Sequence, residues 1–109
     1  MTVRMSLDDA KRALAASLTE AEFQGWLITT AQVLGWRCFH PYDSRRSEAG
    51  FPDVTLVRGE RLLFVELKTM KGKVTAAQQE WLDALGAVPN VDAHVWRPDQ
   101  LDEILEVLA

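Results

Sequence analysis

Two carboxylates and one lysine stand beside two strand-like segments in the middle of the chain. Asp53 precedes the apolar run 54–57, and Glu66 and Lys68 follow the run 62–65. Mg²⁺ prefers oxygen ligands and is commonly bound by one or two carboxylates together with water. A lysine next to such an ion can position the attacking water or neutralise a phosphate group as charge builds on it. These residue types therefore predict metal-dependent hydrolysis of a phosphodiester bond.

The two apolar runs must pair if these side chains are to meet. The connecting segment 58–61 is short and polar and contains a glycine, which predicts an antiparallel hairpin between runs 54–57 and 62–65. In such a hairpin the start of the first strand lies beside the end of the second. Asp53 and Glu66 are therefore expected at the same edge of the sheet.

The alternation of side chains along the second strand predicts to which face of the sheet each of residues 66–68 points. Glu66 and Lys68 point to one face, and Leu67 between them points into the core. We expect Asp53, Glu66 and the carbonyl oxygen of Leu67 to bind Mg²⁺ or Mn²⁺, with Lys68 beside the ion. Neither a thiolate nor a histidine is needed for such a site.

The rest of the sequence supplies the elements of one α/β domain, since 109 residues suffice for a single core. Hydrophobic periodicity and capping residues predict helices over 6–17, 19–34, 75–85 and 98–108, and strands over 36–40, 53–57, 62–65 and 92–97. The first helix could pack on the remainder or bind a partner.

The order of the motifs resembles the VRR-NUC (virus-type replication-repair nuclease) domain of the PD-(D/E)XK nuclease superfamily. The matching stretches are 19–24, 44–47, 50–53, 66–68, and Gln78 with 81–82. Any one of them can arise by chance, but five in the family's order are far more specific. The resemblance implies a restriction-endonuclease-like PD-(D/E)XK core, which is a small mixed four-stranded sheet flanked by helices. Residues 19–109 would form the nuclease domain, and residues 1–18 a helical extension.

The resemblance also adds an acidic residue and a glutamine to the expected site. Glu20 has the family's spacing, whereas Glu22 is explained by a capping box with Thr19. We therefore expect Glu20 to contribute to the metal site, directly or through water. Gln78 resembles the family's glutamine near the metal or phosphate, and a solvated helix amide is the other reading.

The charge distribution is compatible with a nucleic-acid partner even though the net charge is −4. Residues 35–73 carry eight basic and five acidic side chains and are net +3. A cluster of this kind can bind phosphates, although a solvated surface has the same composition. The residues expected to contact DNA are Ser44, Arg45, Arg46, Ser47, Lys71 and Lys73.

The substrate and the assembly follow from the resemblance alone. It implies a homodimer that cuts branched DNA such as Holliday junctions. A less selective duplex or flap nuclease is the alternative enzyme. A catalytically silent nucleic-acid-binding module and an unrelated interaction domain are the alternatives without catalysis.

Several other classes of protein are disfavoured by the sequence. It has no apolar run of about 18 residues and no signal-peptide core, so we expect a cytoplasmic protein without membrane spans. The single cysteine, Cys38, forms no internal disulfide or zinc framework and is expected to be buried. His40 and His94 are expected to be structural, with a proton donor to the leaving oxygen as the other reading of His40. Trp26, Trp36 and Trp81 are expected in the core, and Trp96 in the last strand or at its end.

Overall fold

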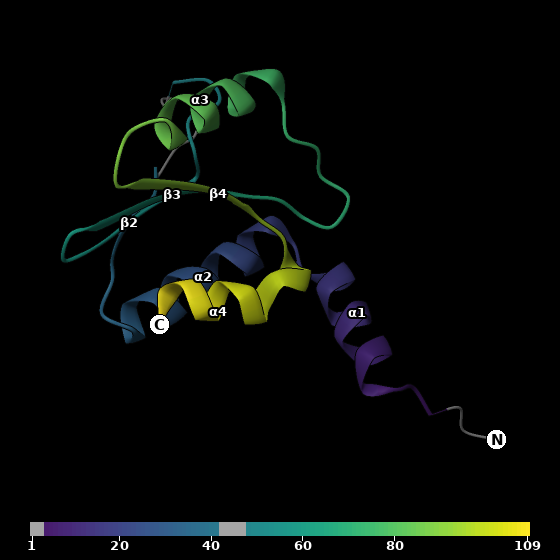
Figure 1. The fold of residues 1–109 in the computed structure, drawn as a ribbon. Helices are drawn as coiled ribbons and strands as arrows, with labels where there is room; N and C mark the ends of the chain where they lie inside the picture. Colours follow the sequence, from purple (N-terminus) through teal and green to yellow (C-terminus); the bar gives the residue numbers. More distant parts are fainter. Residues whose placement is uncertain (1–3, 42–47) are drawn as a thin grey trace.

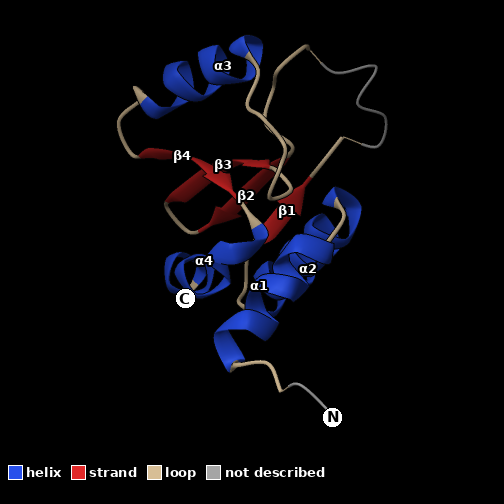
Figure 2. Ribbon diagram, turned by 90° about the vertical axis from the view of Figure 1, so that its right-hand side faces the viewer, coloured by secondary structure: helices blue, strands red, loops and turns tan. Residues whose placement is uncertain are grey.

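The sheet has four strands in the order β1-β2-β3-β4. The computed structural model describes residues 4–41 and 48–109. The strands are β1 (Arg37–Phe39), β2 (Val54–Arg58), β3 (Arg61–Leu67) and β4 (Val91–Trp96). The first three strands pair antiparallel, and β4 pairs parallel to β3 (Figure 2). This mixed sheet confirms the predicted fold class.

Helices cover both faces of the sheet. They are α1 (Leu7–Ser17), α2 (Glu20–Val33), α3 (Ala76–Gly86), the short 3₁₀ helix η2 (Pro98–Gln100) and α4 (Leu101–Leu108). In Figure 1, α2 and α4 lie on one face of the sheet and α3 lies on the other. Because α3 carries the chain from β3 back to β4, the parallel pairing of these strands has its usual helical crossover.

The starts of the first three helices are as predicted from their capping residues. The side chains of Ser6, Thr19 and Thr75 each accept a hydrogen bond from a backbone N–H in the first turn of the helix. The last helix differs from the prediction because the N–H of Arg97 donates to Gln100 Oε1 at 2.8 Å. The 3₁₀ turn itself is closed by the N–H of Gln100, which donates to the carbonyl of Arg97 at 3.0 Å, and the α-helix begins only at Leu101.

The main core lies between the sheet and the pair α2 and α4. Phe23 and Leu27 of α2 and Ile104 and Leu108 of α4 are fully buried against Leu56, Leu63 and Val65 of the sheet. Burying side chains of this size stabilises the fold by roughly 1.5–3 kcal/mol each. The apolar stripe predicted for α2 therefore faces the sheet.

The ends of α2 and α4 are tied together by one arginine. The guanidinium of Arg58 donates to the carbonyl oxygens of Leu34, Leu108 and Ala109, each at 2.9 Å. It also lies 4.7 Å from the centre of the Trp36 ring. The last carbonyls of a helix have no partner inside it, so this cation satisfies two helix ends at once.

The helix α1 lies away from the sheet (Figure 1). Its principal neighbour is η2, and Ala15 is its buried residue, whereas Leu7 and Leu14 are exposed. Within residues 4–41 and 48–109, no helix is both long and apolar enough to cross a membrane.

Candidate active site

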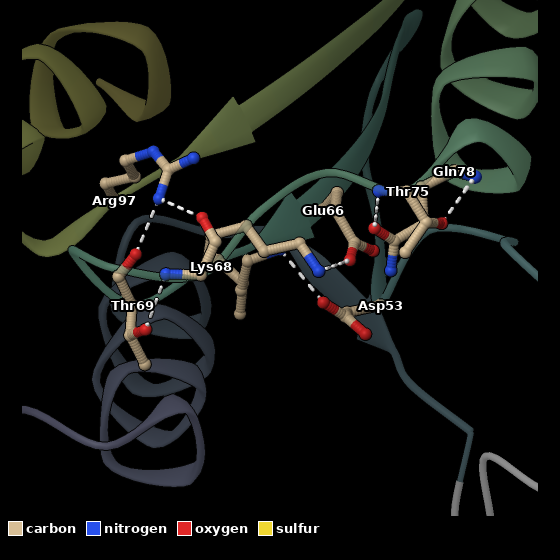
Figure 3. Close-up of polar contacts among 9 residues, drawn as sticks. Asp53, Glu66, Lys68, Thr69, Thr75, Gln78 and Arg97 are labelled. Carbon is tan, nitrogen blue, oxygen red and sulfur yellow. Dashed lines mark hydrogen bonds and ion pairs between the residues drawn. The ribbon is translucent and has the colours of Figure 1, made fainter.

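The hairpin of β2 and β3 brings the two central carboxylates together. Val54 pairs with Val65, so Asp53 and Glu66 lie at the same end of the hairpin. The N–H of Leu67 donates to Asp53 Oδ2 at 2.9 Å (Figure 3). This bond fixes the Asp53 carboxylate at the end of β3, as expected from the pairing.

Glu66 is a buried carboxylate with an unsatisfied oxygen. The residue is 1% exposed, its Oε2 lies 3.2 Å from Lys68 Nζ, and its Oε1 has no hydrogen-bond partner. Burial first, and then repulsion from Asp53, raise the pKa of Glu66 to about 7. A buried oxygen without a partner is costly, and a cation would supply that partner.

Lys68 follows the last residue of β3 and remains attached to the sheet. Its N–H donates to the carbonyl of Trp96 at 3.0 Å. The N–H and C=O groups of one strand residue point to the same side, and alternate residues point to opposite sides. The Leu67 carbonyl therefore points toward Asp53, as a third oxygen ligand would.

The loop that carries Asp53 is anchored to the first turn of α3. Gly50 has φ +85°, and a Cβ built there would lie 2.5 Å from the backbone carbon of Ala77. Phe51 packs edge-on against Trp81, with ring centres 5.0 Å apart, and against Phe64 at 5.8 Å. This attachment is not among the contacts predicted from the sequence, where its one signal is a glycine next to an aromatic residue.

The two glutamates at the start of α2 have different environments. Glu22 Oε1 accepts a hydrogen bond from the Thr19 N–H at 3.0 Å, which lowers the pKa of Glu22. The pKa of Glu20 is raised, first by burial and then by repulsion from Asp53. Glu22 is thus the capping residue, and Glu20 is the one that faces the other carboxylates.

If Glu20 has the role expected from the sequence, Glu20→Gln lowers the expected phosphodiester cleavage about tenfold, the usual effect of losing an outer contact of a metal site. Glu22→Gln should retain activity because glutamine also serves in a capping box. The comparison removes one charge from the same helix turn in each variant. The measurement is the initial cleavage rate of each variant at a fixed metal concentration. An equal loss of rate in the two variants would contradict the assignment of Glu20.

A cleft of about 450 Å³ lies beside these carboxylates. Its lining includes Glu20, Gln24, Glu48, Asp53 and Gln78. Gln78 Oε1 accepts from the Thr75 N–H at 2.9 Å, so Gln78 caps its own helix while its amide nitrogen remains available. Gln78 is therefore neither a freely solvated amide nor remote from Asp53.

The residues predicted to contact DNA are only partly described. Ser44, Arg45, Arg46 and Ser47 lie outside the described residues. Lys71 and Lys73 are exposed and follow Lys68 in the segment that leads to α3. Their role in binding DNA stays a prediction.

The donor set fits a hard cation held by few protein ligands. Within residues 4–41 and 48–109, no three His, Cys, Asp or Glu side chains converge closely enough to hold a metal ion together. Asp53, Glu66 and the Leu67 carbonyl would leave the remaining positions to water, which is the usual coordination of Mg²⁺. Glu20 lines the same cleft as Asp53, and its part in a metal site, directly or through water, stays a prediction.

This chain is similar to known proteins in sequence and in fold. The profile of the VRR-NUC domain matches residues 27–99. A solved structure described as a VRR_NUC domain has 23% identity and a TM-score of 0.63, covering 80% of this chain and 94% of that chain. A second, described as a VRR_NUC domain protein, has 23% identity and a TM-score of 0.64, covering 84% and 85%. The search of curated proteins gave no match.

The matched range contains Asp53, Glu66, Lys68 and Gln78 and begins after Glu20. It lies within residues 19–109, the predicted nuclease domain, and leaves the helical extension 1–18 outside. The two solved structures show that the fold is shared. The chain therefore belongs to the VRR-NUC family of nuclease domains, in the PD-(D/E)XK superfamily.

Proposed function

We propose that this protein is an endonuclease that uses Mg²⁺ or Mn²⁺ to hydrolyse phosphodiester bonds in DNA. The unpaired Oε1 of buried Glu66 beside Asp53 is the observation that supports it most. The pKa of Glu66 stays raised by burial and by Asp53 although Lys68 is paired with it, so a further cation would be favourable there. The Leu67 carbonyl and Lys68 lie beside the two carboxylates, and Asp53 lines the cleft.

Asp53, Glu66 and the Leu67 carbonyl would hold the metal ion, and Glu20 would hold one of its waters. A metal ion bound there would supply a Lewis acid for the scissile phosphate. Asp53 keeps its orientation through the Leu67 N–H, which leaves Oδ1 available to the ion. Most of the site is therefore preformed by the hairpin.

Lys68 is the one cation in the described part of the site. Its side chain is 12% exposed, and its ammonium group lies 3.2 Å from Glu66 Oε2. With three donors, the ammonium group can bind a phosphate oxygen or orient the attacking water without leaving Glu66. Gln78 lines the cleft, from which its amide nitrogen could donate to the substrate.

We further propose that the substrate is branched DNA and that the protein acts as a homodimer. The support is the resemblance of the whole motif order to stand-alone VRR-NUC proteins. A two-fold dimer suits a four-way junction because each subunit would present one active site to a pair of related strands. The exposed Lys71 and Lys73 are available to DNA phosphates next to the site.

The test is cleavage of a labelled four-way junction beside matched duplex, flap and single-stranded substrates, in Mg²⁺, Mn²⁺ or EDTA. We expect paired nicks at the junction that require metal. Lys68→Ala should lower the cleavage rate by about 10²-fold, as loss of a donor to a developing charge does. Light scattering of the free protein measures whether it is a dimer.

The other outcomes identify the alternatives. Equal cleavage of duplex and junction would indicate a less selective nuclease, and cleavage of the flap alone would indicate a flap nuclease. Junction binding without cleavage in either metal would indicate a silent binding module. Cleavage by Lys68→Ala at the rate of the unaltered protein would remove Lys68 from the mechanism.

A further inference from the structure

The turn after Lys68, formed by residues 69–72, is closed by Arg97. Nη1 of Arg97 donates to the carbonyl oxygens of Thr69 at 2.6 Å and Gly72 at 2.7 Å (Figure 3). The N–H of Gly72 also donates to Thr69 Oγ1 at 3.1 Å. One guanidinium nitrogen therefore joins the two ends of this turn.

The closed turn touches the side chain of Lys68. A Cβ built at Gly72 would lie 3.3 Å from Lys68 Cδ, so the Gly72 backbone lies against the lysine stem. The backbone of Lys68 is bonded at the same place, because its N–H donates to the carbonyl of Trp96. Trp96 is the residue before Arg97, so both routes to Lys68 start from the end of β4.

Arg97 is itself held in place from the other side. Its N–H donates to Gln100 Oε1 at 2.8 Å, and Gln100 Nε2 donates to Glu103 Oε2 at 2.9 Å. The first bond fixes the backbone at Arg97, so the side chain extends from a fixed point and loses less conformational entropy when it binds another segment. Arg97 is thus built as a fixed support between η2 and residues 69–72.

We propose that Arg97 is a positioning residue for DNA cleavage, which acts through residues 69–72 on Lys68, Lys71 and Lys73. It holds Lys68 against Glu66 and keeps the two exposed lysines in register with the DNA backbone. This inference rests on the proposed nuclease function and adds to it a residue from the end of β4.

The effect on catalysis and the effect on binding can be separated. Lys68 acts at the reacting phosphate, so its displacement should lower kcat, and a shift of about 1 Å in a catalytic group can cost about 10²-fold. Lys71 and Lys73 act on the DNA backbone. Their loss of register should raise KM and make the salt dependence of DNA binding shallower.

The test compares Arg97→Ala, Arg97→Lys and the control Arg12→Ala, which removes an exposed arginine from α1. We expect Arg97→Ala to lower kcat by about tenfold or more, and to reduce the slope of log K against log salt by about 1–2. Arg97→Lys should recover most of both values. Both bonds to the turn are donated by one nitrogen, Nη1, and the single nitrogen of an ammonium group has three donors. Arg12→Ala should change neither.

A second set of variants separates positioning from direct contact with DNA. In a Lys71→Ala/Lys73→Ala background, Arg97→Ala should produce no further change in the salt slope, since no exposed lysine remains to be displaced. If Arg97→Ala lowers the salt slope in this double variant as much as in the unaltered protein, Arg97 itself binds phosphate, and the positioning role is overturned.

A merely structural role gives a different result. It predicts that Arg97→Ala lowers the thermal unfolding temperature while kcat per folded molecule, KM and the salt slope stay unchanged, which would overturn the inference. Should Arg97→Ala fail to fold, Thr69→Val removes only the hydroxyl acceptor of the turn. For Thr69→Val we expect a smaller loss of kcat than for Arg97→Ala. If kcat and the salt slope of DNA binding are both unchanged in Thr69→Val, the positioning role of Arg97 is also overturned.

Failure of the proposed function is recognised separately. If the unaltered protein cleaves no DNA in Mg²⁺ or Mn²⁺, the nuclease proposal fails. The salt slope of DNA binding still tests Arg97, because it requires no cleavage.

Discussion

Replacement of Glu66 by glutamine should abolish metal-dependent DNA cleavage and at the same time stabilise the metal-free protein. Loss of one of two carboxylate ligands removes several kcal/mol of charge stabilisation, which corresponds to a rate lowered by about 10³-fold or more. Glutamine keeps an oxygen that Lys68 can bond, and its amide can donate to Asp53. The variant should therefore fold with the hairpin intact.

The stabilisation should depend on pH in one direction. The folded-state pKa of Glu66 is raised from 4.5 to about 7. Below pH 4.5 the carboxyl is protonated in both the folded and the unfolded chain, so it does not destabilise the fold. As the pH rises from 4.5 through 7, the unfolded chain loses this proton more readily than the folded chain does, and the free energy of unfolding falls. Since one pKa unit corresponds to about 1.4 kcal/mol, glutamine should recover up to about 3 kcal/mol at pH 8 and nearly nothing at pH 4.

Thermal unfolding in EDTA at several pH values measures this gain, with Glu106→Gln as a control for the loss of one charge from an exposed position of α4. Adding Mg²⁺ or Mn²⁺ should raise the unfolding temperature of the unaltered protein but not that of Glu66→Gln. An equal response of both proteins to metal would show that Glu66 is not a ligand.

Replacement of Gly50 by alanine should be the most destabilising single change in the loop before Asp53. The backbone there has φ +85°, and the new Cβ would lie 2.5 Å and 2.6 Å from the backbone carbon and oxygen of Ala77. Those atoms belong to the first turn of α3 and cannot rotate away. We expect a loss of about 3 kcal/mol or more, together with displacement of Asp53 and loss of cleavage.

Gly59→Ala is the matched control. Gly59 also has a positive φ, +60°, but a Cβ built there meets nothing within 4 Å. Its loss of stability should therefore be about 1 kcal/mol, the cost of the left-handed conformation alone. Chemical unfolding and cleavage rates measure both variants. Similar losses for the two glycines would show that the contact with α3 does not hold the loop.

The parts of the structure that were predictable depend on neighbours in the sequence. The hairpin of β2 and β3 follows from alternation and a short polar connection, so the meeting of Asp53 and Glu66 could be foreseen. The helix starts at Thr19 and Thr75 follow from capping boxes, which involve only residues three apart. The mixed four-stranded sheet was foreseen through the motif order of the family.

The parts that were not predictable depend on contacts between distant segments. The pair Gly50-Phe51 signals a close approach of the backbone, but nothing in the sequence indicates that the neighbour is Ala77. The sequence pattern predicts for Arg97 only the end of a strand, because its partners at residues 69–72 are brought to it by the parallel pairing of β3 and β4. The same holds for Arg58, whose acceptors Leu108 and Ala109 lie at the end of the chain.

The pairing of Lys68 with Trp96 also bears on when the protein becomes competent during folding. The carboxylates Asp53 and Glu66 sit on one hairpin and need only local contacts. The backbone of Lys68 is fixed only when β4 joins β3, and such long-range pairing forms more slowly than a hairpin. A partly folded chain would thus carry its acidic ligands without a placed lysine. We expect cleavage activity to appear only when β4 has paired with β3, which would confine DNA cleavage to fully folded molecules.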